Sequence, residues 1–119
     1  MHTLTHFRLC PFSRSIRLAL AELGIEVAAK EERPWEWRAA FLALNPAGDL
    51  PVLELEHGGV LAGAYVISEY LAEETRRHAG EARALQLLPA AREDRAEARR
   101  IVDWFHRKLD REVTRELLV

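Results

Sequence analysis

The segment from Leu9 to Leu20, LCPFSRSIRLAL, constrains the fold most, because a short apolar strand turns into a helix there at the chain's only cysteine. Apolar residues spaced by three and four after Pro11 predict the helix, since that spacing places them on one face. Proline is well tolerated at a first helical position, where its missing N–H would be unpaired anyway. Cys10 is therefore expected at or next to the N-cap, facing free backbone amides and the positive end of the helix dipole.

Cys10 has two interpretations at that position. The thiolate is the reactive form of cysteine, so a cysteine at a helix N-terminus is well placed for thiol chemistry. A lone cysteine is also often a small buried hydrophobe with no chemical role. A single cysteine excludes an internal disulfide, which fits a reducing compartment.

The composition narrows the class of protein. Hydrophobic residues make up 49% and charged residues 30%, which is ordinary for a globular chain, and 119 residues correspond to one compact domain or to one domain plus part of another. The net charge of −2 gives no electrostatic reason to expect nucleic acid or an anionic membrane as a partner. No apolar run approaches the roughly 20 residues that span a bilayer, and no signal segment is evident. A cytoplasmic protein is predicted.

The patterns along the chain predict alternating strands and helices. Strands are expected at residues 4–9, 25–29, 50–55 and 60–62, and helices at residues 13–23, 36–44 and 65–74. The order β-α-β-α-β-β-α predicts an α/β fold, with a mixed four-stranded sheet covered by helices and a right-handed β-α-β crossover. Residues 76–88 are polar and weakly patterned, and we interpret them as a connector.

One long helix is expected from Ala90 onward. It carries an apolar stripe at every fourth residue, comprising Ile101, Phe105, Leu109, Val113 and Leu117. Leaving such side chains in water costs about 1.5–3 kcal/mol each, so the stripe needs a partner. It can lie across the first domain, pair with another subunit or begin a larger helical domain. The third option is favoured, which gives a domain at residues 1–78, a linker at 79–89 and the first helix of an incomplete all-α domain at 90–119.

Three segments carry a resemblance to a known family: LCPFSRSIRLALAELGIE, FLALNPAGDLPVLELE and VISEYLAEE. In this order and spacing they resemble the thioredoxin-like N-terminal domain of the glutathione S-transferase superfamily, over residues 1 to 78. The Cys-Pro-Phe-Ser segment is most similar to the omega-type and glutaredoxin-like members. The resemblance implies a catalytic role for Cys10, glutathione as co-substrate and a homodimer. Ser13 occupies the second-cysteine position of dithiol glutaredoxins, which implies a monothiol site with Ser13 beside the substrate.

Two further positions concern the glutathione site. Leu50-Pro51 matches the family's cis-proline, and the resemblance implies a cis bond that exposes the Leu50 backbone to the cysteinyl part of glutathione. In the family, Glu or Gln followed by Ser precedes the third helix and holds the γ-glutamyl end. Aligned through VISEYL, those positions are Gly63 and Ala64. Neither side chain can hydrogen-bond a carboxylate, and a lost charge-assisted hydrogen bond costs about 1.5–3 kcal/mol. An impaired glutathione site is therefore expected.

A second resemblance concerns the RPW segment and the final helix, IVDWFHRKLDREVTRELLV. Both are similar to bacterial members of the superfamily that bind the tubulin-like cell-division GTPase and lack clear enzymatic activity. Two functions therefore stay open. One is glutathione-dependent thiol transfer or conjugation at Cys10, and the other is a non-catalytic adaptor that binds a protein partner through its C-terminal helix.

The remaining chemistry-bearing residues give weaker indications. The five histidines show no ligand spacing, so no metal site is expected. Trp35 and Trp37 are interpreted as packing side chains, with the lining of a binding surface as the alternative. Arg33 and Arg38 are interpreted as solvated, with binding of the glycine carboxylate of a thiol peptide as the alternative.

Overall fold

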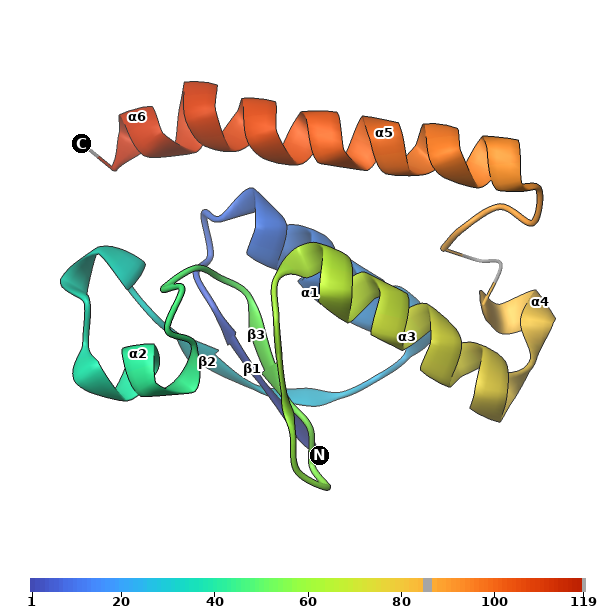
Figure 1. The fold of residues 1–119 in the computed structure, drawn as a ribbon, viewed down its shortest axis with the longest axis horizontal. Coiled ribbons are helices and arrows are strands. Elements are labelled where there is room, and N and C mark those ends of the chain that lie inside the picture. Colours follow the sequence, from blue (N-terminus) through green and yellow to red (C-terminus); the bar gives the residue numbers. More distant parts are fainter. Residues whose placement is uncertain (85–86, 119) are drawn as a thin grey trace. The chain divides into compact units, whose positions relative to one another are not determined.

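A computed structural model describes residues 1–84 and 87–118 of the chain (Figure 1). Its sheet has four strands in the order β2-β1-β3-β4. The strands are β1 (His2–His6), β2 (Val27–Glu31), β3 (Val52–Glu54) and β4 (Val60–Ala62). β1 pairs in parallel with β2 and antiparallel with β3, and β3 pairs antiparallel with β4. The predicted α/β fold with a mixed sheet is confirmed, although β1 and β3 are shorter than expected and β2 begins two residues later.

The helices of the sheet region are α1 (Pro11–Leu23), the 3-10 helix η1 (Pro34–Glu36), α2 (Ala39–Leu44) and α3 (Ala64–Ala79). The expected connector at residues 76–88 was wrong in part, because α3 continues to Ala79 and a short helix α4 (Glu81–Ala84) follows. The last turn of α3 contains three basic residues, and cations stabilise the carboxyl end of a helix even without an apolar pattern. Residues 85 and 86 of that connector lie outside the described residues.

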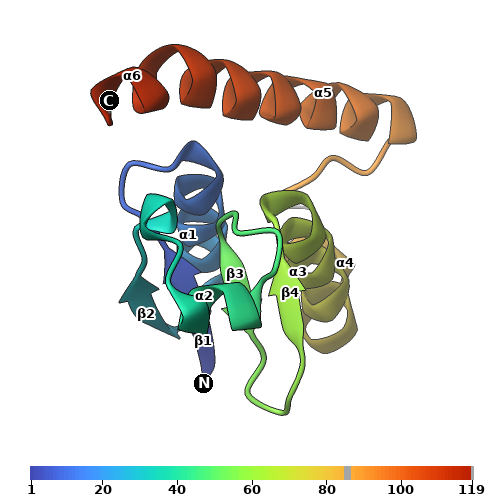
Figure 2. The ribbon, with the colours of Figure 1, turned by 60° about the vertical axis from the view of Figure 1, so that its left-hand side comes forward.

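The two faces of the sheet carry different side chains. Phe7 and Val52 form one buried cluster with Phe41 of α2 and Leu50. Leu53 follows Val52 in β3 and therefore points to the opposite face, where it is fully buried. Figure 2 shows α2 in front of the sheet and α1 behind it. The sheet is thus covered by helices on both faces, as the alternating pattern predicted.

Helix α1 is specified at both ends by local sequence. Pro11 is its first residue, and Gly24 caps its carboxyl end with φ of 69°. In that left-handed conformation, the Gly24 N–H donates to the carbonyl oxygens of Ala21 and Leu20. The inner face includes Ile16 and Leu20, as predicted, and also the polar Ser13.

The chain divides into two compact units, Met1–Glu69 and Tyr70–Val119, with the boundary inside α3. The second unit contains α5 (Arg92–Leu109), a π-helix η2 (Asp110–Thr114) and α6 (Arg115–Leu117), which follow one another without a break. The five residues of the predicted apolar stripe are between 37% and 67% exposed. Among the described residues, no helix combines the length and apolar character needed to cross a membrane.

Candidate functional site

Cys10 is the N-cap of α1, as predicted from Pro11. Its backbone is extended, with φ of −73° and ψ of 119°, and its sulfur accepts a hydrogen bond from the Ser13 N–H at 3.4 Å. A tight turn leads into the cap, because the Cys10 N–H donates to the Phe7 carbonyl oxygen at 3.0 Å. The thiol is half-buried. The turn therefore holds the sulfur against the first free amides of the helix.

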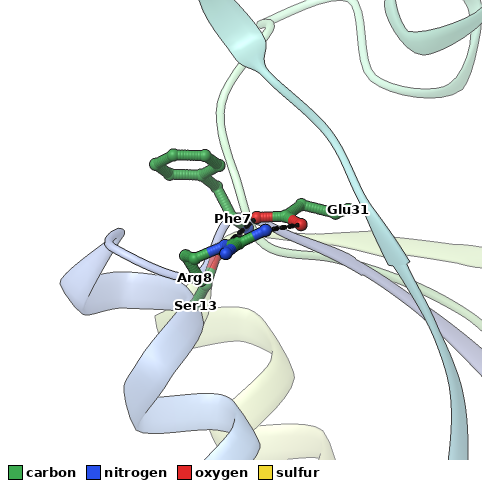
Figure 3. A network of polar contacts seen from close by, with 4 residues as sticks. All are labelled: Phe7, Arg8, Ser13 and Glu31. Carbon is green, nitrogen blue, oxygen red and sulfur yellow. Dashed lines mark hydrogen bonds and ion pairs between the residues drawn. The ribbon is translucent and has the colours of Figure 1, made fainter.

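Ser13 is fully buried beneath this turn. Its hydroxyl oxygen accepts a hydrogen bond from the Phe7 N–H at 3.3 Å, and Figure 3 shows the two residues next to each other. Without Ser13, this N–H would have no partner in a buried position. In the free protein, the hydroxyl is thus engaged with the strand-to-helix turn that carries Cys10.

The other predicted site residues lie around Cys10 in the same compact unit. Cys10 packs against the buried cluster that includes Leu50. The Leu50–Pro51 peptide bond is cis, as the resemblance implied. The Pro51 carbonyl oxygen accepts a hydrogen bond from the Gly63 N–H at 2.9 Å, which joins the start of β3 to the residue before α3. The fold therefore brings Cys10, Leu50, Pro51 and Gly63 to the same end of strands β1, β3 and β4.

Gly63 and Ala64 form the entry into α3. Gly63 adopts φ of 100°, a conformation that L-residues rarely take, and a Cβ built there would meet nothing within 4 Å. Ala64 is the first residue of α3 and is buried. This end of the site has room for a side chain but offers none that could hold a carboxylate.

Arg8, two residues before Cys10, is paired with a carboxylate of the protein. Arg8 binds Glu31 through two hydrogen bonds, of 2.7 and 2.8 Å (Figure 3). The Arg8 guanidinium lowers the pKa of the Glu31 carboxyl to about 2. Because both partners lie at the surface, the pair is expected to contribute little to the stability of the fold.

Arg38 makes a second bidentate pair, with the buried Glu32. Its guanidinium donates to the two Glu32 carboxylate oxygens at 2.8 and 3.0 Å. These hydrogen bonds hold the pKa of Glu32 below its usual range. Arg33 lies 3.7 Å from Glu36. Both arginine side chains are more than half exposed, as their interpretation as solvated residues predicts, and Arg38 is in addition held by Glu32.

Trp35 and Trp37 stand on the turn between β2 and α2. The Trp35 ring packs edge-on against Phe7, with ring centroids 5.1 Å apart. Trp37 has φ of 50°, which is unusual for a bulky residue and costs roughly 1–3 kcal/mol. Its ring lies so close to Gly48 that a Cβ there would be 2.8 Å from a Trp37 ring carbon. The expected helix at 36–44 is therefore interrupted at Trp37 and resumes at Ala39.

The described residues contain no group of three His, Cys, Asp or Glu side chains that could hold a metal ion. Two features of the site were not predicted from sequence, namely the Ser13–Phe7 hydrogen bond and the Glu32–Arg38 pair. The spacing of Ser13, Ile16 and Leu20 would have placed the serine on the inner face of α1, where a hydroxyl needs a partner. The pairing of Glu32 with Arg38 depends on the turn at Trp37, which has no local sequence pattern.

Comparison with known proteins identifies glutathione S-transferases and a protein named for its localization with FtsZ as relatives of this chain. The family model for the N-terminal domain of glutathione S-transferase matches residues 9–74. A curated relative is the FtsZ-localized protein A of Caulobacter vibrioides, which is 43% identical over 119 residues, 98% of this chain and 49% of that protein. The solved structure of FzlA from C. crescentus is 41% identical, with a TM-score of 0.80 over 98% of this chain and 50% of that one.

Other similar solved structures are described as glutathione S-transferases. A glutathione S-transferase from Sinorhizobium meliloti is 44% identical, with a TM-score of 0.87 over 99% of this chain and 50% of that one. One from Methylobacterium radiotolerans, solved with glutathione sulfonate, is 30% identical, with a TM-score of 0.69 over 83% of this chain and 43% of that one. The chain thus spans about half the length of these relatives. With its thioredoxin-like sheet and cis-proline, it belongs to the glutathione S-transferase family.

Proposed function

We propose that this chain is a protein-binding member of the glutathione S-transferase family that associates with FtsZ, and not a glutathione-conjugating enzyme. The observation that carries the proposal is the entry into α3, where Gly63 and Ala64 provide no side chain for the γ-glutamyl carboxylate. Arg38 on the β2–α2 turn does not replace that contact, because two hydrogen bonds hold its guanidinium against Glu32.

The similarity to FtsZ-localized protein A supports the choice of partner. The similarity extends over nearly the whole chain, including the C-terminal helix that the family model does not match. This helix exposes large apolar side chains, among them Phe105 at 56% and Leu117 at 67%. Exposed apolar residues of this kind are typical of protein-binding surfaces. We propose that the stripe on α5 contributes to binding, within a cytoplasmic homodimer.

Co-sedimentation with polymerised FtsZ tests the association. The wild-type chain should pellet with FtsZ filaments in the presence of GTP and remain in the supernatant without them. Phe105→Ser should reduce the pelleted fraction several-fold, because it removes a large exposed ring from the stripe. Val60→Ser is the matched control, since Val60 is exposed at 47% but lies on β4. Light scattering during gel filtration measures the dimer.

Calorimetry with glutathione tests the other half of the proposal. The proposal requires no heat of binding for the wild-type chain at glutathione concentrations of about 1 mM. Saturable binding below that concentration would contradict the loss of the glutathione site. An absence of FtsZ co-sedimentation would contradict the adaptor function even if glutathione does not bind.

A second function is favoured by the geometry of Cys10. The Ser13 N–H lies 3.4 Å from its sulfur, and the half-buried thiol is at the N-terminus of a thirteen-residue helix. This arrangement supports glutathione-dependent thiol transfer, in which the Cys10 thiolate attacks a disulfide and one of its sulfurs leaves as a thiolate. Leu50 and Pro51 would contact the cysteinyl part of glutathione, and Ser13 would support the turn.

Thiol-transferase assays of the wild type and Cys10→Ser distinguish the two functions. Activity that is lost in Cys10→Ser would establish the second function. FtsZ association that persists in Cys10→Ser would show that the thiol is dispensable for the adaptor function. The conservative substitution keeps a hydrogen-bond acceptor at the N-cap, so the fold should be retained.

A further inference from the structure

We propose that His6, the last residue of β1, makes the turn that carries Cys10 sensitive to mild acid. We call residues 7–10 the Cys10 turn. It is closed while the His6 imidazole is neutral and opens when the imidazole is protonated, which exposes the half-buried Cys10 thiol and the buried Ser13 hydroxyl to solvent. The inference concerns contacts within the first compact unit and depends on neither FtsZ nor glutathione.

The His6 side chain lies on the face of the sheet that α1 covers. His6 alternates with Leu4 along β1, and Leu4 pairs with the fully buried Leu53, which points to that face (Figure 2). The backbone of His6 is fixed as well, because its carbonyl oxygen accepts a hydrogen bond from the Glu32 N–H at 2.8 Å. The strand therefore fixes the point from which the imidazole extends toward α1.

One ring nitrogen of His6 is buried without a hydrogen bond. The Nδ1 atom is shielded from solvent and has no partner among the described residues. In the neutral ring this nitrogen can carry the lone pair, whereas protonation places an N–H on both ring nitrogens. A buried N–H without an acceptor is costly, and a buried charge is more costly still. Protonation therefore favours a conformation in which the ring reaches water.

The charged groups around His6 also oppose protonation. Burial of the imidazole lowers its pKa, and so do two cations, Arg17 on α1 and Arg8 in the Cys10 turn. Glu31, the neighbour of His6 on β2, raises the pKa, but Arg8 already binds both of its carboxylate oxygens, at 2.7 and 2.8 Å (Figure 3). On the other side of β1, the register with β3 continues to the uncharged Pro51. A protonated His6 would thus face two cations and a carboxylate that is already bound.

The Cys10 turn is the part of the chain best able to yield. Phe7, directly after His6, uses both of its backbone groups in the turn. Its N–H donates to the Ser13 hydroxyl oxygen at 3.3 Å, and its carbonyl oxygen accepts from the Cys10 N–H at 3.0 Å. The first of these is longer than most N–H···O hydrogen bonds. Movement of the imidazole toward water would displace Phe7 and break these two contacts first.

The direction of the pKa shift gives the pH range. In an open turn His6 has its ordinary pKa of about 6.5, and the closed turn lowers this pKa. The closed turn is therefore fully stable above pH 6.5 and loses stability as the pH falls from 6.5 toward the lower pKa. Because opening takes up one proton, it becomes up to about tenfold more favourable per pH unit within this range.

Amide hydrogen exchange of the ¹⁵N-labelled full chain, followed by NMR from about pH 7.5 down to about pH 5, tests the proposal. The protection factor corrects the exchange rate for the intrinsic effect of pH. It should fall for the Phe7 and Cys10 amides below about pH 6.5, by up to about tenfold per unit. Leu53 in the inner strand β3 is the internal control and should keep its protection. In His6→Gln, which removes the titrating ring, all three protection factors should stay constant.

Matched variants separate His6 from other groups. His57→Gln removes an exposed histidine between β3 and β4 and should give the wild-type profile. Arg17→Gln removes an exposed cation that acts on His6. It should raise the pKa of His6, read from the imidazole NMR signals, and reduce the loss of protection in acid. Arg14→Gln removes an exposed cation of the same helix that is not among the groups acting on His6, and it should change neither quantity.

Two outcomes would overturn the proposal. One is the same pH profile of the Phe7 and Cys10 amides in the wild type and in His6→Gln. The other is a parallel loss of protection at Leu53, which would mean that acid unfolds the whole unit and not the turn alone. If His6→Gln does not fold, the two arginine variants decide, and equal pH profiles for Arg17→Gln and Arg14→Gln overturn the proposal.

Discussion

The two ends of the candidate site differ in what they retain. At the Cys10 end, the sulfur is hydrogen-bonded, Ser13 is fully buried beneath the turn and the cis-proline is in place. At the α3 end, Gly63 and Ala64 leave a position that is open to a side chain but holds none that could bind an anion.

The difference follows from which groups the fold itself needs. Ser13 satisfies a buried backbone N–H, and Cys10 accepts a hydrogen bond as an N-cap, so losing either group affects stability. A Cβ at Gly63 would meet no atom within 4 Å, so the packing of the fold does not require a side chain there. A role in folding is therefore sufficient to account for Cys10, and the α3 end is the better indicator of whether glutathione is bound.

The largest effect is expected for Ser13→Ala. It removes the only described acceptor for the buried Phe7 N–H and should lower the free energy of unfolding by about 1–3 kcal/mol. Urea unfolding followed by circular dichroism measures the change. Ser68→Ala is the matched control, because the Ser68 hydroxyl donates to the Tyr65 carbonyl oxygen at an exposed site. If the two variants are equally stable, the fold does not need the Ser13 hydroxyl, and the presence of Ser13 is not explained by folding.

Introducing the family's Gln-Ser pair before α3 should have the next largest effect, on glutathione affinity. Gly63→Gln with Ala64→Ser supplies the family's pair and should strengthen glutathione binding about tenfold, since such a hydrogen bond is worth about 1.5–3 kcal/mol. The strain of a non-glycine residue at φ of 100° should at the same time lower stability by about 1–2 kcal/mol. Calorimetry measures both the wild type and the variant. Glutathione binding that is unchanged by the pair would mean that the two ends do not form one site.

A smaller effect is expected at Cys10 itself. Cys10→Ala removes the N-cap acceptor and should lower the free energy of unfolding by about 0.5–1 kcal/mol, whereas Cys10→Ser should stay close to the wild type. Thermal unfolding of the three proteins measures the difference. If Cys10→Ala is as stable as the wild type, the sulfur is not retained for folding, and a chemical role for Cys10 gains support.

The smallest effect concerns the pH dependence of stability. Hydrogen bonds from Arg38 lower the pKa of Glu32, so this pair contributes stability above the unfolded pKa of about 4.5. That contribution is lost as the pH falls below 4.5, through the lower folded pKa. Arg38→Leu should flatten the fall in unfolding free energy over this range, and Arg33→Leu, which leaves the Arg38 pair intact, should not. Equal slopes would mean that Arg38 is available to a ligand.

Local patterns predicted the parts of the fold that depend on a few neighbouring residues. Pro11 and Gly24 fix the ends of α1 through backbone geometry alone, so its limits followed from the sequence to within two residues. The cis bond before Pro51 came from the family resemblance, because a proline at the start of a strand does not by itself indicate a cis bond.

Other features depend on contacts between distant residues. The left-handed Trp37 requires space at Gly48, eleven positions later, so the helix pattern at 36–44 was misleading. The Glu32–Arg38 pair needs that same turn to bring its partners together. Both tryptophans make the packing contacts expected of them, Trp35 with Phe7 and Trp37 with Gly48, but their exposure of 47% and 62% could not be predicted from local patterns.

The π-helix η2 changes the geometry of the apolar stripe that begins at Ile101. On an α-helix, each step of four residues advances the direction of a side chain by about 40°, so four steps would turn the stripe by about 160°. The π-turn at Asp110–Thr114 accommodates one extra residue and sets the direction back by about 100°. Leu117 therefore points within about 60° of Ile101. Deleting Arg111 or Glu112 would turn η2 into regular α-helix and, because fifteen α-helical steps also turn by about 60°, Leu117 would keep its direction. The π-turn thus lets the chain carry one extra residue without dividing the contact surface.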